Sequence, residues 1–253
     1  MTDYDIQIYA MQDKHECYRI SKKDLFDLNM RLLIIGKSQL SGKSTMIGNL
    51  LLRPFNKKDK AGKQFYKKDF DGEDIFVVCP SFDLDSKWSR MITDLKIPDT
   101  NVYKEYDEEE LEALYRFLEA DFHEHLAEGR KPKHKLVILD DCSFGGDLKS
   151  KIHGVISKIA CNGRHILVSM IITSQKYSDI STTVRENCTG AIIFACSDKQ
   201  LDLIYSDIST MPKKAFKTMF RKATHEKHSF FVVNYTNDAD DRYCGSNFKR
   251  LKD

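Results

Sequence analysis

Short apolar runs recur along the chain, and longer polar segments separate them. The runs cover residues 32–35, 75–79, 136–139, 166–173, 191–196 and 230–235. Continuous apolar runs of four to eight residues, rich in isoleucine and valine, are typical of strands that are buried on both faces of a sheet. The pattern therefore predicts a largely buried sheet of at least six strands. Residues 18–20 and 102–106 are weaker candidates for further strands.

The connecting segments carry apolar residues at helical spacing. The clearest case is a segment from residue 107 to residue 128, which opens with acidic side chains and is followed by Gly129. Its inward face is predicted to consist of Leu111, Leu114, Tyr115, Leu118 and Phe122. Further helices are predicted over residues 44–52, 85–94, 148–160 and 198–205, and a turn or short helix over 184–187. Strands that alternate with helices predict an α/β fold with a mostly parallel sheet and helices on both faces.

The organisation of the chain follows from these elements. We expect an N-terminal extension over residues 1–31, one core over 32–235 and an irregular polar tail over 236–253. No apolar run approaches the roughly 20 residues that a membrane-spanning helix needs, and the N-terminal residues do not resemble a signal peptide. The seven cysteines form no C-x-x-C pair, so we expect Cys79 and Cys196 to be small buried thiols in a reducing compartment.

The segment over residues 32–51 is the most informative part of the chain. It reads as a buried strand, a short polar turn that ends in Gly42-Lys43-Ser44, and an amphipathic helix. Backbone N–H groups of such a turn converge with the positive end of the helix dipole, which is the arrangement that binds phosphate. Lys43 would reach the β- and γ-phosphates, and the Ser44 hydroxyl would bind Mg²⁺. The expected nucleotide-binding set is Gly36, Lys37, Ser38, Ser41, Gly42, Lys43, Ser44 and Thr45.

The spacing in this turn departs from the usual pattern. A phosphate-binding loop has four residues between its first glycine and Gly-Lys, whereas five residues separate Gly36 from Gly42. Either the loop carries an insertion, or Lys37 takes the position of the first glycine. Two other interpretations are a degenerate loop that binds phosphate poorly and a coincidental turn before a helix.

Two acidic residues follow the apolar run at 136–139. Ligands of open α/β sheets bind at the carboxyl ends of the strands, so Asp140 would lie beside the phosphate loop and hold Mg²⁺. Asp141 would then orient or deprotonate an attacking water. The alternative is that two acids merely end a strand and solvate the next turn.

A third strand end, at Gln175, completes this set of candidates. Gln175 could sense the γ-phosphate or position water, or it could simply cap the strand. Farther along, Arg185 could enter the site of a neighbouring subunit, where a guanidinium would compensate charge on the transferred phosphoryl group. Arg185 could equally form a structural ion pair with Glu186 or another acid.

The net charge is only +2, but positive charge is unevenly distributed. Residues 53–68 are strongly basic. Lys213, Lys217 and Arg221 recur every fourth residue, so on a helix they would form one positive stripe. Such clusters are either solvated faces or contacts with a nucleic-acid backbone.

Together, three segments of the chain resemble the poxvirus-type DNA-packaging ATPases of the FtsK/HerA group. The segments are GKSQLSGKST, VILDDCSF and NGRHILVSMIITSQKYSDISTTVRENCTGAIIF. The resemblance spans residues 32–194 and implies a RecA-like P-loop NTPase core that uses ATP and Mg²⁺. It also implies a homo-oligomeric ring that moves double-stranded DNA into a capsid, with a capsid or portal-vertex protein as a further partner. The corresponding location is the host cytoplasm or a viral factory, or the virion itself.

The resemblance assigns roles residue by residue. By it, Lys43 and Ser44 are the phosphate-loop pair, Asp140 is the Mg²⁺ acid and Asp141 is the catalytic acid. The remaining two assignments are Gln175 as the sensor and Arg185 as the arginine finger. The long phosphate loop and an aspartate at the second acidic position, where many such ATPases have glutamate, are departures from the family pattern.

Two other classes of function use the same motifs. A nucleotide or polynucleotide kinase would share the phosphate loop but would want an acceptor site and a lid of arginines. A non-catalytic nucleotide-binding scaffold would tolerate the unusual loop, although it would not require Lys43, Ser44, Asp140 and Asp141 together.

Overall fold

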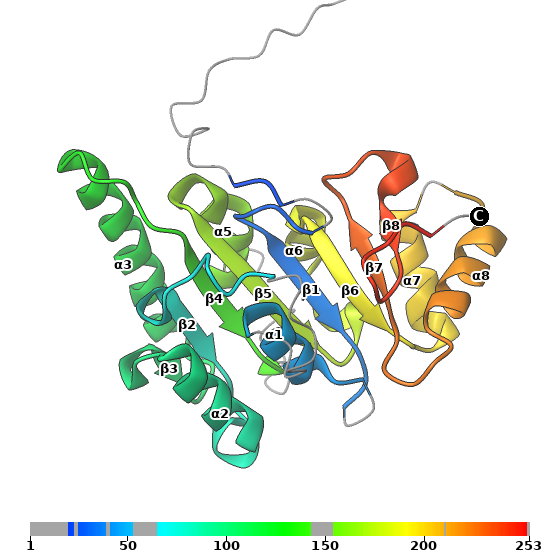
Figure 1. The fold of residues 1–253 in the computed structure, drawn as a ribbon, viewed down its shortest axis with the longest axis horizontal. Coiled ribbons are helices and arrows are strands. Elements are labelled where there is room, and N and C mark those ends of the chain that lie inside the picture. The colour runs from blue at the N-terminus through cyan, green and yellow to red at the C-terminus, as the bar shows by residue number, and fades with distance from the viewer. Residues whose placement is uncertain are drawn as a thin grey trace, which may run out of the picture.

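The computed structural model describes residues 20–22, 25–38, 41–52, 65–142, 154–209 and 211–251. These residues form one eight-stranded sheet with helices packed on it. Figure 1 shows the sheet with its strands in the order β3-β2-β4-β5-β1-β6-β7-β8. The strands are β1 (Arg31–Ile35), β2 (Ile75–Val78), β3 (Val102–Tyr103), β4 (Lys135–Leu139), β5 (Val168–Ser174), β6 (Gly190–Phe194), β7 (Phe230–Asn234) and β8 (Tyr243–Cys244). The helices are α1 (Lys43–Leu51), α2 (Ser86–Leu95), α3 (Glu108–Ala127), α5 (Val155–Asn162), α6 (Thr182–Asn187), α7 (Asp198–Ile208) and α8 (Lys213–Ala223).

The order of the strands determines which loops meet. β1 lies between β5 and β6, and β5 lies between β1 and β4, with all of these pairs parallel. In register, Ile35 is paired with Ser174, and Leu139 with Ile172. The carboxyl ends of β1, β5 and β4 are therefore neighbours along one edge of the sheet, whereas β7 and β8 run antiparallel at the far side.

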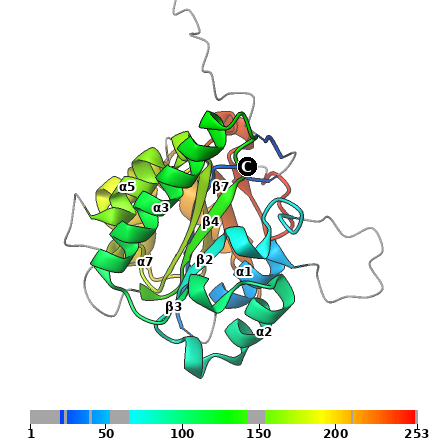
Figure 2. The same ribbon diagram turned by 90° about the vertical axis from the view of Figure 1, so that its left-hand side faces the viewer.

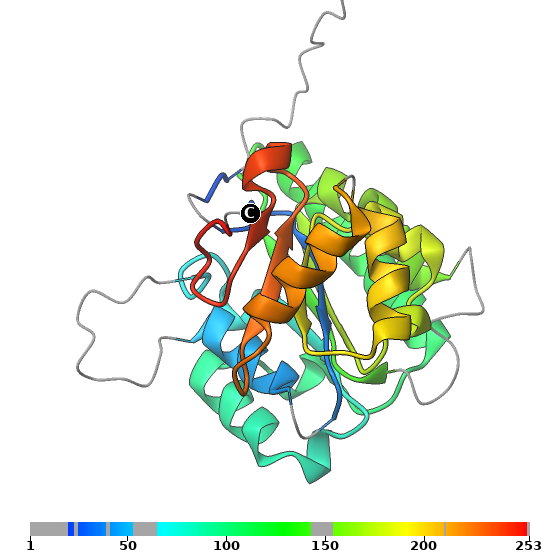
Figure 3. The ribbon, with the colours of Figure 1, turned by 90° about the vertical axis from the view of Figure 1, so that its right-hand side faces the viewer.

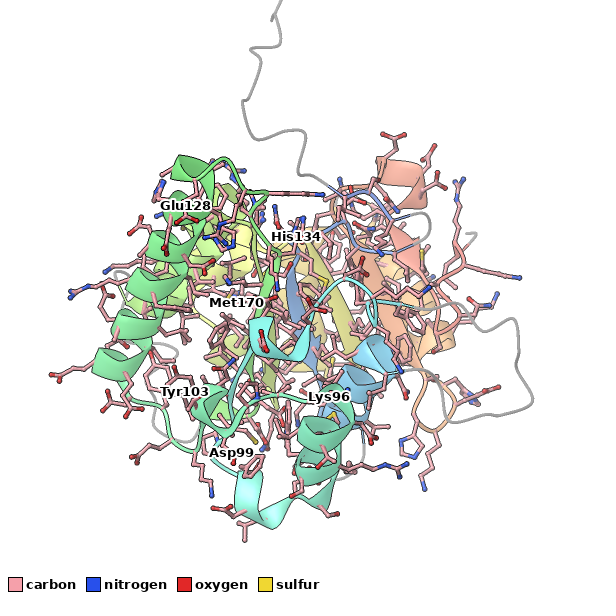
Figure 4. The ribbon with its side chains drawn as sticks, turned by 60° about the vertical axis from the view of Figure 1, so that its left-hand side comes forward. Lys96, Asp99, Tyr103, Glu128, His134 and Met170 are labelled. Carbon is pink, nitrogen blue, oxygen red and sulfur yellow. The ribbon has the colours of Figure 1, made fainter. Side chains whose placement is uncertain are left out.

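Two separate hydrophobic cores lie on the two faces of the sheet. Alternate residues of β1 divide between them: Leu33 and Ile35 face the core under α3, α5, α7 and α8, while Leu32 and Ile34 face the core under α1 and α2. Figure 2 shows these layers from the side, and Figure 4 adds the described side chains to the ribbon. Since parallel strands with apolar side chains on both faces must be covered twice, the apolar runs of the sequence explain this three-layer arrangement.

Most predicted elements are confirmed, with small shifts at their ends. The six apolar runs correspond to β1, β2, β4, β5, β6 and β7, and the predicted helices to α1, α2, α3, α5 and α7. The strand predicted from residue 166 begins only at Val168, because Ile166 ends a 3₁₀-helix over residues 163–166, and the edge strand β3 contains two residues rather than the expected five. The candidate strand at 18–20 and the first part of the helix predicted over 148–160 fall mainly outside the described residues.

The polar tail is irregular over most of its described length, but it contains a 3₁₀-helix at residues 239–241 and a short strand that the sequence did not predict. Residues 243–244 form the strand β8 at the edge of the sheet, and the buried ring of Tyr243 stacks on Phe231 with 5.5 Å between ring centroids. Residues before β1 also join the core, because Leu25, Phe26 and Leu28 are buried. The core therefore extends past both ends of the 32–235 segment.

Two further expectations concern cysteines and membranes. The cysteines in the described part of the chain are free thiols; Cys79 is buried as expected, whereas Cys196 is half-buried. Among the helices of the described residues, none combines the length and the apolar character that crossing a lipid bilayer requires.

Candidate functional site

The turn between β1 and α1 requires glycine at two positions. A side chain on Gly36 would lie 2.5 Å from Ser41 Cβ and 2.9 Å from a ring carbon of Phe194, so this position accepts only glycine. Gly42 precedes α1 with φ = 89°, a left-handed conformation that costs glycine little. The Ser41 hydroxyl donates to the carbonyl of Lys37 at 2.7 Å and fastens the described ends of the turn together. Residues 39 and 40, which decide the spacing question, lie outside the described residues.

Lys43 is the first residue of α1, and its side chain folds back over the turn. The Nζ atom donates to the carbonyl oxygen of Gly36 at 3.0 Å and lies 4.0 Å from Asp141 Oδ2, although the side chain is only 7% exposed. A buried ammonium is unfavourable unless it is well paired. The amine is therefore held across the mouth of the turn, where the phosphates of a bound nucleotide would replace the carbonyl contact.

Asp140 is buried and receives hydrogen bonds from three different elements. Its Oδ1 accepts from the Thr173 hydroxyl at 2.6 Å, and its Oδ2 accepts from the Ser44 hydroxyl at 3.1 Å and the Trp88 indole N–H at 2.6 Å. The Cys79 thiol lies 4.0 Å from the same Oδ2, and burial raises the pKa of this thiol to about 11, so the sulfur keeps its proton near neutral pH. These donors fix the carboxylate at the end of β4, against the start of α1.

Asp141 occupies an unusual backbone conformation beside this network. Its φ is 54°, a region that aspartate visits more readily than most residues and that clusters at functional sites. The Thr173 hydroxyl holds that conformation by accepting the Asp141 backbone N–H at 2.9 Å. Gln175 Nε2 donates to Asp141 Oδ2 at 3.0 Å. The other oxygen, Oδ1, is buried and has no hydrogen-bond partner within the described residues.

The structure thus brings five predicted side chains together: Lys43, Ser44, Asp140, Asp141 and Gln175. These contacts link three strand ends, which a coincidental turn, a solvated strand end or a simple strand cap would not require. Lys37, Ser38 and Thr45 are exposed around the turn, and no contact from these side chains to the two acids is present in the described residues.

Two residues of the site were not predicted from the sequence. Trp88 is not among the candidate residues of the sequence analysis, but its indole N–H donates to Asp140 across 52 residues of sequence. Thr173 was treated as part of an apolar strand, yet its hydroxyl connects the side chain of Asp140 with the backbone of Asp141. A threonine next to a strand's polar end was an available signal, whereas nothing local to Trp88 indicates that α2 lies beside β4.

The residues present fit a nucleotide with its magnesium ion. Mg²⁺ in phosphate-transfer sites takes few protein oxygens and completes its shell with phosphates and water. Ser44 Oγ and Asp140 Oδ2 supply two such oxygens side by side. The described residues contain no group of three or more His, Cys, Asp or Glu side chains placed to hold an ion by themselves.

Arg185 is not part of this constellation. It forms an ion pair with Asp207, donates to the Thr182 hydroxyl at 3.1 Å and lies over the Tyr177 ring at 4.9 Å from its centroid. The structural ion pair weighed from the sequence is therefore present, with Asp207 on α7 rather than Glu186 as the acid. A role for Arg185 in a neighbouring subunit's site stays a prediction.

Comparison with known proteins places this architecture in a family. The sequence profile described as "Poxvirus A32 protein" matches residues 17–248. The chain belongs to the poxvirus A32 family. An "Uncharacterized protein 015R" of Frog virus 3 (isolate Goorha) is 22% identical over 206 residues, which is 81% of this chain and 56% of that protein. The A32-family chain thus spans about half the length of this curated relative.

Solved structures share the fold of this A32-family chain. The genome packaging NTPase B204 from Sulfolobus turreted icosahedral virus 2, in complex with AMPPCP, superposes with a TM-score of 0.53 at 17% identity over 81% of this chain and 92% of that chain. EssC (ATPases 2 and 3) from Geobacillus thermodenitrificans gives a TM-score of 0.52 at 14% identity over 73% and 35%. At these identities the likeness establishes the fold alone, which is the RecA-like P-loop NTPase fold expected from the sequence.

Proposed function

We propose that this chain is an ATP-hydrolysing motor that translocates double-stranded DNA, and that it packages a viral genome into a capsid. The observation that carries the proposal is the meeting of Lys43, Ser44, Asp140, Asp141 and Gln175 at the carboxyl ends of β1, β4 and β5. Membership of the A32 family supports it. A further support is the likeness of fold to B204, which is described as a genome packaging NTPase.

Each side chain has a distinct task in the proposed reaction. The turn between Gly36 and Lys43 cradles the phosphates of ATP, and the Lys43 amine balances charge on the β- and γ-phosphates. Ser44 and Asp140 would hold Mg²⁺, which supplies charge neutralisation at the phosphates when bound. The unpartnered Oδ1 of Asp141 suits it to accept a proton from the attacking water, while Gln175 keeps the other oxygen of that carboxylate in place.

Hydrolysis in a motor must be coupled to a partner outside the nucleotide site. We propose that copies of this chain assemble as a ring, because an arginine finger compensates charge on the phosphoryl group from a neighbouring subunit. Double-stranded DNA is the proposed substrate, and a capsid or portal-vertex protein is the proposed docking partner. The corresponding place of action is the host cytoplasm or a viral factory.

The test is ATP turnover of the full chain with and without long duplex DNA, at low and moderate salt. We expect DNA to stimulate turnover and the stimulation to fade with salt, because contacts to backbone phosphates release counterions. Lys43→Ala should abolish turnover. Asp141→Asn should keep ATP binding and lower turnover by about 10²- to 10⁴-fold, the usual contribution of a general base.

Other outcomes would favour a different function for the nucleotide site. Phosphate transfer from ATP to a small acceptor, without a DNA effect, would favour a kinase. ATP binding without turnover, also in the presence of DNA, would favour a nucleotide-binding scaffold. Turnover that survives Lys43→Ala would overturn the assignment of the phosphate loop, and loss of ATP binding in Asp141→Asn would make Asp141 a structural residue or a metal ligand.

A further inference from the structure

The positive stripe on α8 forms ion pairs with the neighbouring helix α7. Lys213 and Lys217 both contact Asp202, at 2.8 and 2.7 Å, and Arg221 contacts Asp198 at 2.9 Å. The two acids stabilise the cations of the stripe. In return, the hydrogen bonds from these cations lower the pKa values of Asp198 and Asp202. The stripe is thus a face paired with α7 and not a free positive surface.

Free positive charge instead gathers just beyond the end of α8. A hollow of about 830 Å³ lies between the end of this helix, the turn at residues 225–229 and the loop at 245–247. We call it the basic hollow. Its exposed cationic and imidazole side chains are Lys222, His225, Lys227 and His228. No ion pair to these four side chains forms within the described residues, and Glu226 is the acid on the same turn.

The basic hollow lies at the same edge of the sheet as the nucleotide site. β7 is antiparallel to β6, and Phe230 at its start is paired with Phe194 at the end of β6. The two rings pack with 5.6 Å between centroids. Phe194 in turn touches Gly36, where a Cβ would approach the ring to 2.9 Å. Two aromatic rings therefore connect the hollow with the phosphate loop, and Figure 3 shows the orange turn before β7 on the same side as α1.

The chemistry of the lining favours phosphate over a protein partner. Protein interfaces centre on aromatic and apolar anchors with few charges, whereas this hollow presents lysine, imidazole and amide groups, beside one acid, Glu226, and the apolar Leu251. The Ser246 hydroxyl in its wall is bonded to the backbone of Phe230: it accepts from the N–H at 2.8 Å and donates to the carbonyl at 3.1 Å. Lysine and asparagine side chains are usual contacts to the sugar-phosphate backbone of DNA, and they bind it without reading sequence.

We infer that the basic hollow binds backbone phosphates of double-stranded DNA and that the Phe194–Phe230 pair transmits this contact to the phosphate loop. The inference rests on the proposed function and specifies where its DNA binds. DNA bound in the hollow would shift the start of β7. The packed rings of Phe230 and Phe194 would transmit this displacement to Gly36, since close-packed side chains transmit strain.

The experiment measures the affinity of the full chain for a fluorescent duplex of arbitrary sequence over a series of salt concentrations. The test variant is the double substitution Lys222→Gln, Lys227→Gln. Each phosphate contact contributes a slope of about 0.9 in log K against log salt, so we expect the slope to fall by about 2. DNA stimulation of ATP turnover should then require more DNA than in the wild type.

A matched control removes the same charge elsewhere. Arg116 is 76% exposed in the middle of α3, 3.8 Å from Glu112, and Lys131 is exposed just before β4, where that strand starts at the opposite edge of the sheet. The double variant Arg116→Gln, Lys131→Gln should keep the wild-type slope. Both doubles should unfold close to the wild type, because substitutions of exposed side chains usually change stability by less than about 0.5 kcal/mol.

The possible results separate this inference from the proposed function. A wild type that neither binds duplex DNA nor responds to it would overturn the proposed function together with the inference. A wild type that responds, with an unchanged slope in the Lys222, Lys227 double variant, would overturn the inference alone. A changed assembly state in sedimentation, at an unchanged salt slope, would make the hollow a protein contact and would also overturn it.

Discussion

Asp140 is a buried carboxylate to which several side chains of the site donate hydrogen bonds. Such a group is costly to bury unless hydrogen bonds compensate it, and here donors arrive from α1, α2 and β5. The hydrogen bond from Ser44 to Asp140 is the contact that Mg²⁺ would replace, because these two side chains are the groups that would hold the ion. Trp88 and Thr173 would then remain as the groups that keep the carboxylate aimed at the phosphate loop.

Trp88→Phe tests this positioning role. The ring stays apolar and buried, but Asp140 Oδ2 loses its indole donor, so we expect the Mg²⁺ concentration for half-maximal turnover to rise about 10- to 100-fold, as for other partners of metal ligands. The measurement is a magnesium titration of ATP turnover. Met91→Leu is the matched control, because Met91 is buried in the same core beside α1, and should leave the titration unchanged. An unaltered titration in Trp88→Phe would reduce Trp88 to a packing residue.

At the scale of elements, the last strand closes the core beside α7 and α8. The Tyr243 ring stacks on Phe231 and makes an edge contact with Phe216 of α8 at 5.9 Å, and its hydroxyl donates to the carbonyl of Ile208 at 3.2 Å. One side chain of β8 therefore joins β7, α7 and α8. The segment that we expected to be an irregular tail is part of the folded unit for this reason.

Tyr243→Ala should lower the free energy of unfolding by about 3–5 kcal/mol, the cost of deleting a large buried aromatic ring. Tyr243→Phe keeps the ring and removes only the bond to Ile208, so it should cost about 1 kcal/mol. Urea denaturation monitored by circular dichroism measures both. Equal stabilities of the alanine variant and the wild type would mean that β8 is not integral to the core.

At the scale of the whole molecule, the question is how copies of the chain act together. Arg185 is only 11% exposed and is held by Asp207 and Tyr177 within its own chain. Tyr177, which lies against Arg185, has a shifted pKa. Burial raises the pKa of the Tyr177 hydroxyl above its usual range, and the positive charge of Arg185 lowers that pKa in part. A finger role requires this guanidinium to exchange Asp207 for the phosphates in a neighbouring subunit.

Mixing two inactive variants tests that exchange. Arg185→Ala subunits keep an intact site, and Asp141→Asn subunits keep an intact arginine. If Arg185 acts across the subunit boundary, mixed assemblies should recover part of the ATP turnover that both pure variants lack, because some interfaces combine the two intact halves. Turnover measured over a range of mixing ratios gives the result. No recovery at any ratio, with confirmed co-assembly, would confine Arg185 to its ion pair with Asp207.

Most of the fold and the main residues of the candidate site could be predicted, because the sequence patterns that indicate them are local. The apolar runs predict β1, β4 and β5 from side-chain patterning alone, and Lys43, Ser44, Asp140 and Asp141 stand next to those runs in the sequence. Parallel strands bring their carboxyl ends to one edge, so the convergence of these residues follows from general rules of α/β folds. The sequence by itself therefore determined the class of fold and the main chemical groups.

Contacts between distant segments were decided only by the tertiary structure. Trp88 reaches Asp140 because β2 pairs with β4, and Arg185 reaches Asp207 because α6 and α7 come together on one face. The acids of α7 pair with the cations of the stripe on α8, whereas the described residues offer no ion pair to the cations of the basic hollow. A local pattern specifies which side chains share a face of one element, but the order of strands and the packing of helices specify which faces meet, and these depend on the whole chain at once.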